Sequence, residues 1–477
     1  MDYYFPTSLL ITSRDIITLW VARMVLASYF NTGKRPFQDV FIHPKILDKY
    51  GEGMSKTKGN GIDPVFVIEK FGADSLRFAI AYLTTESQDV RLALDYECPY
   101  CGATVEQTKK NRTLPKILCP KCKKEFSTQW AETAEDKALS RGPLVGERFE
   151  VARNFCNKLW NASRFVMMNL EGFRPMKVDE SQLLLEDRWI LSRLAEVIRT
   201  VTSSLEHFRF SEAARALYDF AWDEFCSFYV EMIKGRLFDD AQKQTAQAIL
   251  VAVLDTILRL LHPITPFVTE EVWQRLREFA PVRGLVPQQT APAVCVAPWP
   301  TVEEIPFTDL LDKEYGEKIA GQFAVFQEIL RSIREARARQ NVPPKTTIHA
   351  TLRCETQVCE LLEPMRAALA KMAGVVIDDW GPEVTAPPLC ATVVSPQGEV
   401  YVDIAGLIDI DAEIAKKEKE IAKIIGFVKS KEAKLSGGFA QKAPAAVVEK
   451  ERQSLEELKA QLASNEEMLA KLRQAKK

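Results

Sequence analysis

The longest regular pattern in the sequence is a set of apolar residues that recur every three or four positions from Gly146 onward. Such spacing places apolar side chains on one face of an α-helix. Three stripes follow it, formed by Phe155, Leu159, Ala162 and Val166, by Ile190, Leu194, Val197, Val201 and Leu205, and by Ala214, Leu217, Ala221, Phe225, Phe228 and Met232. They predict an antiparallel helix bundle over residues 129–300, with a proline-rich loop at Pro281–Pro300.

Residues 1–94 carry a different pattern, in which apolar runs typical of strands alternate with helical spacing. The expected elements are a buried strand at Tyr3–Thr12, a helix at Asp15–Phe30, a second strand at Asp39–His43 and the start of another helix at Pro64–Lys70. Strand and helix in alternation are typical of a nucleotide-binding α/β sheet. The N-terminal segment is therefore predicted to be part of a Rossmann-like sheet.

Residues 301–406 mix both periods. The expected elements are a basic amphipathic helix at Gln322–Arg339, a strand at Thr347–Arg353, a helix at Gln357–Met372 and a strand at Val400–Ile404. Because strands and helices alternate over a short stretch, we predict a small α/β module. Its pattern indicates no specific role.

Residues 407–477 keep a heptad seam of apolar residues, interrupted by Gly437-Gly438 and Ala443-Pro444. The seam consists of Leu407, Ile410, Ile414, Ile421, Ile424, Val428 and Leu435, and then of Val448, Leu455, Leu458, Leu462, Leu469 and Leu472. Two seams around a Gly/Pro turn predict an antiparallel coiled-coil hairpin. A dimerising coiled coil is the alternative, but the breaker at the midpoint favours self-pairing.

Composition narrows the class of protein. The chain has 477 residues, 47% of them hydrophobic, and a formal charge of -2, which predicts about three or four globular domains and no overall attraction to nucleic acid. A nucleic-acid surface would have to be local. The sequence shows no basic, apolar signal segment and no uninterrupted apolar run near the roughly 18 residues of a membrane helix. We therefore expect a cytoplasmic protein without membrane contact.

Four of the ten cysteines stand in two C-x-x-C pairs, Cys98 with Cys101 and Cys119 with Cys122. This spacing predicts a zinc ribbon at residues 95–128, in which four thiolates close a tetrahedral structural Zn²⁺ site and leave no position open for chemistry. Seven basic residues and one acid lie between Cys98 and Lys124. The ribbon is therefore a candidate for contact with nucleic-acid phosphates, and a solvated charged face is the alternative.

The loop Gly53–Asn60 holds two lysines and two hydroxyl residues between glycines. A lysine ammonium is a compact charge on a flexible stem, which suits a loop that closes over phosphate oxygens and stabilises developing negative charge. Most short segments of this composition are solvated turns, so the flanking residues have to decide between the two interpretations.

With its flanks Asp39–His43, Ile62–Pro64 and Phe71–Phe78, this loop resembles the KMSKS signature of class I aminoacyl-tRNA synthetases. Together with Asp15–Met24, the order and spacing are similar to the valyl branch of that family. The resemblance implies ATP-dependent activation of valine, with Mg²⁺, and transfer of the valyl group to tRNA(Val). It also implies that an N-terminal half with the HIGH signature, and an inserted editing domain, precede this segment in the family.

The resemblance also suggests site residues. Lys56 falls on the family's second lysine and is the candidate catalytic residue. The candidate ATP-binding residues are Met54, Ser55, Lys56, Thr57 and His43. Gly53 stands where the family has its first lysine, which puts the strength of ATP binding in question, whereas Thr57 keeps the hydroxyl of the serine it replaces.

By the same resemblance, Asp15 and Trp20 border the amino-acid pocket, where Asp15 would meet the ammonium group and Trp20 would wall off a small branched side chain. The alternatives are a helix N-cap aspartate and a core tryptophan. Ser13-Arg14 departs from the family's usual Gly-Phe at this point. A satisfied core histidine is likewise the alternative to an ATP contact for His43.

The bundle and the C-terminal hairpin resemble the family's anticodon-binding domain and tRNA-binding arm. Phe225 and Tyr229 are candidates for stacking on bases, and Lys234 for contact with phosphate; two core aromatics at helical spacing are the alternative. The segment from Lys416 to Lys442 contains eight lysines and three glutamates. The arm's candidate tRNA contacts are Lys429, Lys431 and Lys434.

No histidine lies in a sequence like HIGH, since the four histidines stand at positions 43, 207, 262 and 349. We therefore expect the C-terminal portion of a longer synthetase, or one piece of a split one, whose partner is the missing N-terminal half. It should be inactive alone. The rival hypothesis is a non-catalytic tRNA-binding module or partner subunit. Isoleucyl or leucyl specificity is disfavoured by Trp20–Met24 and by the C-terminal hairpin.

Overall fold

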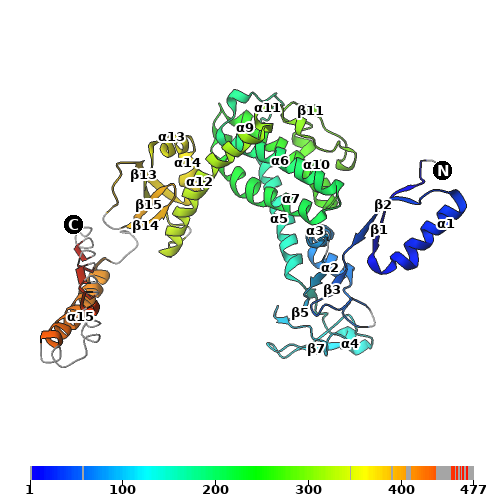
Figure 1. Cartoon of the computed structure of the whole chain (residues 1–477), viewed down its shortest axis with the longest axis horizontal. Helices are drawn as coiled ribbons and strands as arrows, with labels where there is room; N and C mark the ends of the chain where they lie inside the picture. Colours follow the sequence, from blue (N-terminus) through cyan, green and yellow to red (C-terminus); the bar gives the residue numbers. More distant parts are fainter. Residues whose placement is uncertain are drawn as a thin grey trace. The chain divides into compact units, whose positions relative to one another are not determined.

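The structure is a computed structural model that describes residues 3–55, 58–86, 88–343, 345–387, 390–403 and 410–436, and parts of 453–470. The chain divides into two units, Met1–Ile319 and Ala320–Lys477. Figure 1 shows the first unit in blue to green and the second in yellow to red. Each unit is described here by itself.

The first unit begins with a two-stranded parallel sheet. Strand β1 (Thr7–Ser13) pairs with β2 (Phe37–His43), so that Ser13 lies opposite His43. The connection consists of the helical turns η1 (Arg14–Ile16) and η2 (Ile17–Val21) and the helix α1 (Ala22–Thr32). The predicted strand, helix and second strand are confirmed.

The predicted burial of the first strand is wrong for this chain. Thr12 is the only buried residue of β1, and large apolar side chains around it are exposed. They include Ile11 at 54%, Leu19 at 61% and Phe30 at 90% exposure. Parallel sheets are normally covered on both faces, and a pair of strands has too few neighbours to bury either face. The β1–β2 sheet and the helical segment that connects its strands therefore have apolar side chains that the described residues leave uncovered.

The next segment carries the loop Gly53–Asn60, called the lysine loop from here on. Strand β3 (Ile46–Asp48) pairs in parallel with β4 (Val90–Leu92). Between them lie the loop and two helices, α2 (Pro64–Phe71) and α3 (Ala73–Leu83). Asp63 caps α2 by accepting a hydrogen bond from the Val65 amide, with Pro64 at the first helical position, as expected from helix-start chemistry.

The cysteine segment (residues 95–128) folds into short antiparallel strands. Strands β6 (Thr104–Val105), β5 (Asp95–Glu97) and β9 (Leu144–Val145) form one sheet, and β7 (Lys116–Leu118) and β8 (Glu125–Ser127) form another. The short helix α4 (Ala134–Ala138) follows β8. Tyr96 and Phe126 are almost fully buried and give this small fold an apolar centre.

The helix bundle is present as predicted. Its main helices are α5 (Glu147–Met168), α6 (Leu185–Glu206), α7 (Phe210–Tyr218), η4 (Asp219–Tyr229), α8 (Val230–Met232), α9 (Lys243–Leu261), α10 (Pro266–Phe279) and α11 (Thr308–Leu311). The short turns are η3 (Glu180–Gln182), η5 (Arg236–Phe238), η6 (Val294–Val296) and η7 (Val302–Glu304). The loop at Pro281–Pro300 also contains a small hairpin of β10 (Val282–Arg283) and β11 (Gln288–Gln289).

The bundle has an apolar core. The predicted stripe residues Phe155, Leu159, Val166, Ile190 and Leu217 are each at most 1% exposed. Within the described residues, α9 is the one helix long and apolar enough to cross a membrane, and 89% of its most apolar window is buried. That burial is typical of the central helix of a bundle.

The second unit begins in α12 (Lys313–Arg339), whose range spans the division of the chain. A four-stranded sheet follows, with the order β13-β12-β15-β14. Its strands are β12 (Ile348–Arg353), β13 (Val375–Gly381), β14 (Cys390–Ser395) and β15 (Gly398–Asp403), and its helices are α13 (Thr356–Leu362), η8 (Glu363–Met365) and α14 (Arg366–Ala373). The predicted alternation is confirmed, whereas β13 and β14 were not anticipated.

The last helix with defined bounds is α15 (Ile410–Ser436), and the described residues within 453–470 are helical as well. Lys417 donates to Asn465 at 2.9 Å, and Lys459 forms an ion pair with Glu432 at 2.8 Å. As the residue number rises along α15, the number of its partner falls. The two segments therefore run antiparallel, whereas the Gly/Pro breaker lies outside the described residues.

Candidate functional site

The lysine loop leaves the carboxyl end of β3, the edge at which open α/β sheets bind ligands. Lys56 and Thr57 lie outside the described residues, so the roles given to them stay predictions. Met54 and Ser55 are half-buried. The Ser55 hydroxyl oxygen accepts a hydrogen bond of 3.2 Å from the Lys58 amide, which joins the two sides of the loop near its middle.

Asn60 closes the base of the loop. Its side-chain oxygen accepts from the Ser55 amide at 2.9 Å, and its side-chain nitrogen donates to Asp48 at 2.8 Å and to the Gly53 carbonyl oxygen at 3.3 Å. Asn60 is 3% exposed. We call this arrangement the Asp48–Asn60 latch, because one amide group holds the strand end and both sides of the loop together.

Asp48 is the fixed end of the latch. Its carboxylate also accepts hydrogen bonds from the backbone amides of Tyr50 at 2.9 Å and Glu52 at 2.8 Å. Burial alone would raise the pKa of Asp48, but hydrogen bonds from Asn60 and these amides, with the charge of Arg112, outweigh burial and lower the pKa. Asp48 is therefore ionised at neutral pH.

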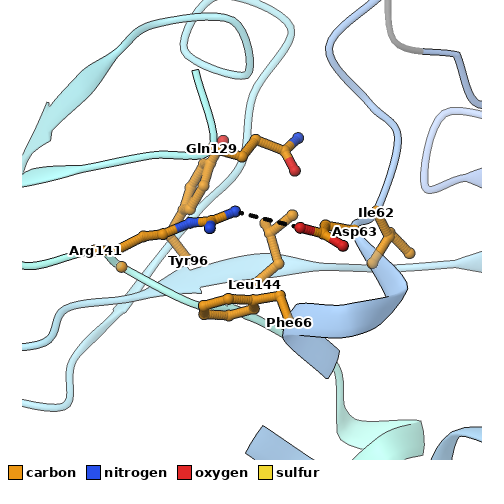
Figure 2. A pocket seen from close by; sticks show the side chains of 8 residues that line it. Ile62, Asp63, Phe66, Tyr96, Gln129, Arg141 and Leu144 are labelled. Atoms are coloured by element: carbon orange, nitrogen blue, oxygen red, sulfur yellow. Dashed lines mark ion pairs between the residues drawn. The ribbon is translucent and has the colours of Figure 1, made fainter. Parts of the chain in front are cut away.

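The segment after the loop is held separately. Figure 2 shows Arg141 reaching toward Asp63, with the nearest nitrogen and oxygen 3.8 Å apart. The same guanidinium lies 4.7 Å from the centre of the Phe66 ring. Gln129 donates a hydrogen bond of 2.9 Å to the Gly61 carbonyl oxygen. These contacts fix the chain between the loop and the first turn of α2.

A charged cluster lies at the carboxyl edge of the β1–β2 sheet. Asp15 forms an ion pair with Lys45, just after β2, and Arg14 pairs with Asp89 at 2.6 Å. The His43 Nδ1 is 2.9 Å from the Pro44 carbonyl oxygen. The structure thus brings the predicted residues Asp15 and His43 to the same edge, at the ends of neighbouring strands.

Neither alternative raised for the pocket residues holds within the described structure. Trp20 is 57% exposed, so it is no core tryptophan of the described structure. Asp15 is no N-cap either, because Ser13 occupies that position and no side chain caps the turn. Their assignment to an amino-acid pocket stays a prediction, and the exposure of the indole is compatible with it.

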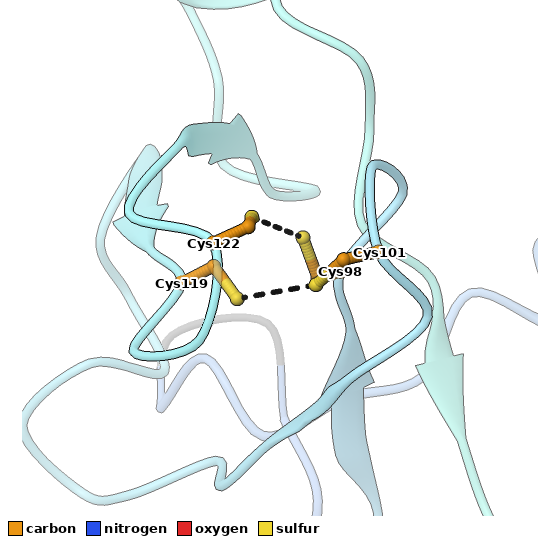
Figure 3. A group of neighbouring side chains, drawn as sticks. All are labelled: Cys98, Cys101, Cys119 and Cys122. Carbon is orange, nitrogen blue, oxygen red and sulfur yellow. Dashed lines mark hydrogen bonds between the residues drawn. The ribbon is translucent and has the colours of Figure 1, made fainter.

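The four predicted metal ligands do converge. The sulfurs of Cys98, Cys101, Cys119 and Cys122 all lie within 4.8 Å of one another. Figure 3 shows them facing each other from two C-x-x-C turns, the knuckles Cys98–Cys101 and Cys119–Cys122. The sulfurs of Cys98 and Cys122 are 3.6 Å apart, and those of Cys101 and Cys119 are 3.7 Å apart. A tetrahedral Zn²⁺ with bonds of about 2.3 Å requires sulfurs about 3.8 Å apart. The arrangement fits that ion.

The chemistry of the knuckles also suits a metal. Hydrogen bonds from the backbone amides of Cys122 and Lys121 outweigh burial and lower the pKa of the Cys119 thiol to about 6. At Cys101 a backbone hydrogen bond from Ala103 is outweighed by burial and by the other three cysteines, which raise its pKa to about 11, so the thiolate character is concentrated at Cys119. The thiolate, not the thiol, is the metal-binding form. Among the described residues, these four cysteines are the one group placed to hold an ion with three or more such ligands.

The candidate stacking residues of the bundle are not available in this structure. Phe225 and Tyr229 are both fully buried. The Tyr229 hydroxyl donates to Asp187 at 2.9 Å, and Arg236 donates to the same carboxylate at 2.8 Å. The prediction that they stack on bases is therefore wrong here, and the core alternative is correct: their helical spacing is that of packing residues.

The candidate lysines differ in their surroundings. Lys234 pairs with Glu231 at 2.6 Å and lies 5.4 Å from the centre of the Phe165 ring, so its charge is already partly balanced. On α15, Lys429 and Lys434 are exposed and Lys431 is half-buried. Lys429 and Lys434 are thus accessible to a ligand, and all three stay candidates for contact with phosphate.

Three protein-family models match consecutive parts of the chain. Residues 1–93 match "tRNA synthetases class I (I, L, M and V)". Residues 187–352 match "Anticodon-binding domain of tRNA ligase", and residues 409–473 match "Valyl tRNA synthetase tRNA binding arm". The cysteine segment lies between the first two matches.

Curated relatives match nearly the whole chain. The valine–tRNA ligase of Rhodopirellula baltica is 52% identical over 99% of this chain and 45% of its own length. Those of Syntrophotalea carbinolica and Enterococcus faecalis are 36% and 38% identical over 99% of this chain and 46% of their own lengths. The chain thus spans less than half the length of these relatives.

Proposed function

Because the chain belongs to the valyl branch of the class I tRNA synthetases, we propose that it is the C-terminal portion of a valine–tRNA ligase acting in the cytoplasm. In this role it contributes the lysine-loop side of the catalytic sheet, an anticodon-binding bundle and a tRNA-binding arm. The observation that carries the proposal is the 52% identity over 99% of the chain. Three family models in the order catalytic domain, anticodon domain and arm support it.

The proposed reaction is attack of the valine carboxylate on the α-phosphate of ATP, which forms valyl-adenylate and releases pyrophosphate, followed by transfer of the valyl group to tRNA(Val). The leaving pyrophosphate gains negative charge in the transition state. A lysine placed there only at that moment lowers the barrier without tightening ground-state binding. Lys56 takes this role, and Met54, Ser55 and Thr57 carry the loop around it, with Mg²⁺ accompanying ATP.

The Asp48–Asn60 latch supports this assignment. A lysine on a loop contributes fully to catalysis only if both ends of that loop are fixed, because a displacement of about 1 Å can cost roughly 100-fold in rate. The latch fixes the two ends through one buried amide. His43 ends β2, and Asp15 and Trp20 lie on the turns η1 and η2 that follow β1; we place valine and the rest of ATP at these residues.

Catalysis also requires a partner for the β1–β2 sheet. The segment that connects its two strands leaves large apolar side chains exposed, with Trp20 on η2 at 57% and Phe30 on α1 at 90% exposure. Several exposed large apolar side chains on one segment are typical of an interaction surface. The relatives are more than twice as long as this chain. We propose that the HIGH-bearing N-terminal half covers this surface and completes the sheet.

The remaining parts serve tRNA and stability. We assign the four cysteines of the zinc ribbon to one structural Zn²⁺, which would hold the two knuckles together. The antiparallel arm formed by α15 and the described helical residues of 453–470 offers Lys429, Lys431 and Lys434 to the tRNA backbone. Such contacts bind phosphate and carry no base specificity.

The decisive experiment is reconstitution. Alone, the chain should show no valine-dependent pyrophosphate exchange, and it should become active when joined to the HIGH-bearing half. Lys56→Ala should then slow activation by about 100- to 1,000-fold, with a smaller change in valine affinity. Lys58→Ala is the matched control on the same loop and should have a smaller effect. Equal exchange without Lys56 would support the rival hypothesis of a non-catalytic tRNA-binding module.

A further inference from the structure

The cysteine segment contacts the lysine loop directly. Arg112 lies in the spacer between the two cysteine pairs. Its guanidinium is 3.3 Å from the Asp48 carboxylate and 3.2 Å from that of Glu52. Lys109 pairs with the same Glu52 at 2.5 Å. Arg112, which belongs to the cysteine segment, thus neutralises the Asp48 carboxylate on which the Asp48–Asn60 latch is built.

This ion pair is shielded from solvent. The side chains of Arg112 and Asp48 are 14% and 7% exposed, so solvent screens their interaction much less than that of a surface pair. Removing the cation would leave the Asp48 carboxylate buried without its charged partner. Breaking one side of a buried pair is far more disruptive than losing a surface contact.

The same spacer also abuts the other side of the loop. Gly59 has a φ of +69°, and a Cβ atom built on it would lie 2.4 Å from the Thr113 methyl carbon and 3.1 Å from the Arg112 carbonyl oxygen. Glycine is needed here both for the left-handed backbone and for the close approach. Gly61 and Asp63 are held by Gln129 and Arg141 (Figure 2), so contacts from residues 109–141 surround the loop base.

Arg112 follows a turn of the spacer that is stabilised by hydrogen bonds within the turn itself. The Asn111 side chain accepts from the Thr108 amide at 2.7 Å and donates to the Glu106 carbonyl oxygen at 2.9 Å. The cysteine knuckles anchor both ends of the spacer. The position of the guanidinium is thus set by the fold of the cysteine segment and not by the loop that it contacts.

We propose that Arg112 is a positioning residue for the lysine loop: by pairing with Asp48 and Glu52 it holds the latch in place, so that the fold of the cysteine segment sets the position of the loop. Arg112 does not touch substrate and acts only through the latch. The cysteine segment is then a support for the loop, in addition to any contact that it makes with tRNA. This inference concerns the loop proposed above as the ATP-binding site, but its first test does not depend on that function.

The first test is amide hydrogen exchange on the chain itself. Arg112→Met removes the charge and keeps most of the side-chain length. We expect the Glu52 and Ser55 amides, which donate to Asp48 and Asn60, to exchange about tenfold faster or more, since a charge-assisted bond is lost. Arg112→Lys should restore part of the protection. Lys116→Met is the control, because Lys116 pairs with Glu125 within the cysteine segment.

Unchanged exchange of the Glu52 and Ser55 amides in Arg112→Met would overturn the proposal. The Gly102 and Lys123 amides, which are hydrogen-bonded within the knuckles, report whether the cysteine segment is still folded. If they also exchange faster, Glu52→Gln decides the matter, because it weakens the same contact from the loop side and leaves the knuckles intact. Faster exchange at Ser55 in that variant supports the proposal, and unchanged exchange rejects it.

The second test uses the reconstituted enzyme. Arg112→Met should lower the maximal rate of pyrophosphate exchange about tenfold with little change in KM for valine, and Arg112→Lys should recover part of the loss. A structural role without influence on the loop would leave both constants unchanged at a temperature where the variant is folded, and would contradict the proposal. Absence of exchange in the unaltered reconstituted enzyme would instead reject the proposed function, while the hydrogen-exchange result would stand.

Discussion

The carboxylate of Asp74, in the first turn of α3, accepts a 2.6 Å hydrogen bond from the backbone amide of Val268, in the first turn of α10 and 194 residues later in the chain. It also accepts from the Phe267 amide at 3.2 Å. Nearby, Arg77 donates to the carbonyl oxygens of Pro263 and Ile264, both at 2.9 Å. One turn of α3 therefore binds the amides that open α10 and the carbonyls that precede it, which joins the loop-bearing segment to the bundle.

Asp74→Asn should weaken this junction. The substitution removes a buried charge that satisfies two backbone amides at a helix start, which we expect to cost about 1–3 kcal/mol of unfolding free energy. Urea unfolding followed by circular dichroism at neutral pH measures it. Asp309→Asn is the control, because Asp309 stands exposed in the first turn of α11, and its change should stay within about 0.5 kcal/mol. Equal effects of the two substitutions would contradict the importance of the junction.

Zinc should bind at about one ion per chain in freshly purified, reduced protein. Cys119→Ser should release it, because a hydroxyl replaces a thiolate that the surrounding amides stabilise. Chelation should loosen the cysteine segment while leaving the helical signal of the bundle, since that core is separate. Cys295→Ser, at an exposed cysteine, is the control and should keep the metal. Metal analysis with undiminished zinc in Cys119→Ser would exclude this site.

A buried pair of acids predicts how stability depends on pH. Glu186 and Asp187 share Arg236, which lies 3.0 Å from the first and 2.8 Å from the second. Burial, together with the charge of Asp187, raises the pKa of Glu186 from 4.5 to about 7. An acid with a raised pKa in the folded state holds its proton there after the unfolded chain has lost it. Stability should therefore fall as pH rises from about 4.5 to about 7.

Glu186→Gln should remove much of this pH dependence, because the amide is always neutral and its oxygen still accepts from Arg236. Relative to the unaltered chain, the variant should gain up to about 3 kcal/mol at pH 8 and little at pH 4.5. Urea unfolding at several pH values measures the difference. Glu212→Gln, at an acid on α7 that pairs with Arg209, is the control. A variant that is less stable than the unaltered chain at pH 8 would contradict the assignment.

Binding of tRNA should weaken steeply with salt. If Lys429 and Lys434 contact phosphates, changing both to Gln should lower affinity and reduce the slope of log affinity against log salt by about 2, roughly one per contact. Fluorescence anisotropy between about 50 and 200 mM salt measures the slope. Lys313→Gln, at a fully exposed lysine of α12, is the control. Deleting residues 411–477 should have a larger effect, and unchanged binding after that deletion would exclude the arm.

Elements whose pattern is local were predictable from the sequence. The stripes of the bundle, the strand, helix and strand around α1 (Ala22–Thr32) and the convergence of Cys98 with the other three cysteines all follow from spacing alone. Each depends on residues a few positions apart, or on a metal geometry that dictates its own ligand spacing. The loop Gly53–Asn60 differs from these elements, because it was distinguished from a solvated turn only by its resemblance, with its flanks, to the KMSKS signature.

The sequence alone could not show which residues of an apolar stripe or run are exposed to solvent and which are buried. Helical spacing placed Phe225 and Tyr229 on one face, but only packing showed that this face is the core. A run of apolar residues likewise predicted a buried first strand, which is largely exposed because its sheet has only two strands in the described structure. Periodicity identifies an apolar face, and the number of neighbouring elements determines whether that face is buried.

The supports of the lysine loop came from tertiary structure alone. Arg112 and Asp48 are 64 residues apart, and Asp74 and Val268 are 194 apart, distances over which no local pattern extends. The lysines and hydroxyl residues of the loop are compatible with phosphate binding, because residue type alone fixes the charge and the hydrogen-bonding groups of a side chain. Which carboxylate becomes a buried anchor, and which arginine neutralises it, is decided only when folding brings the two together and removes the water between them.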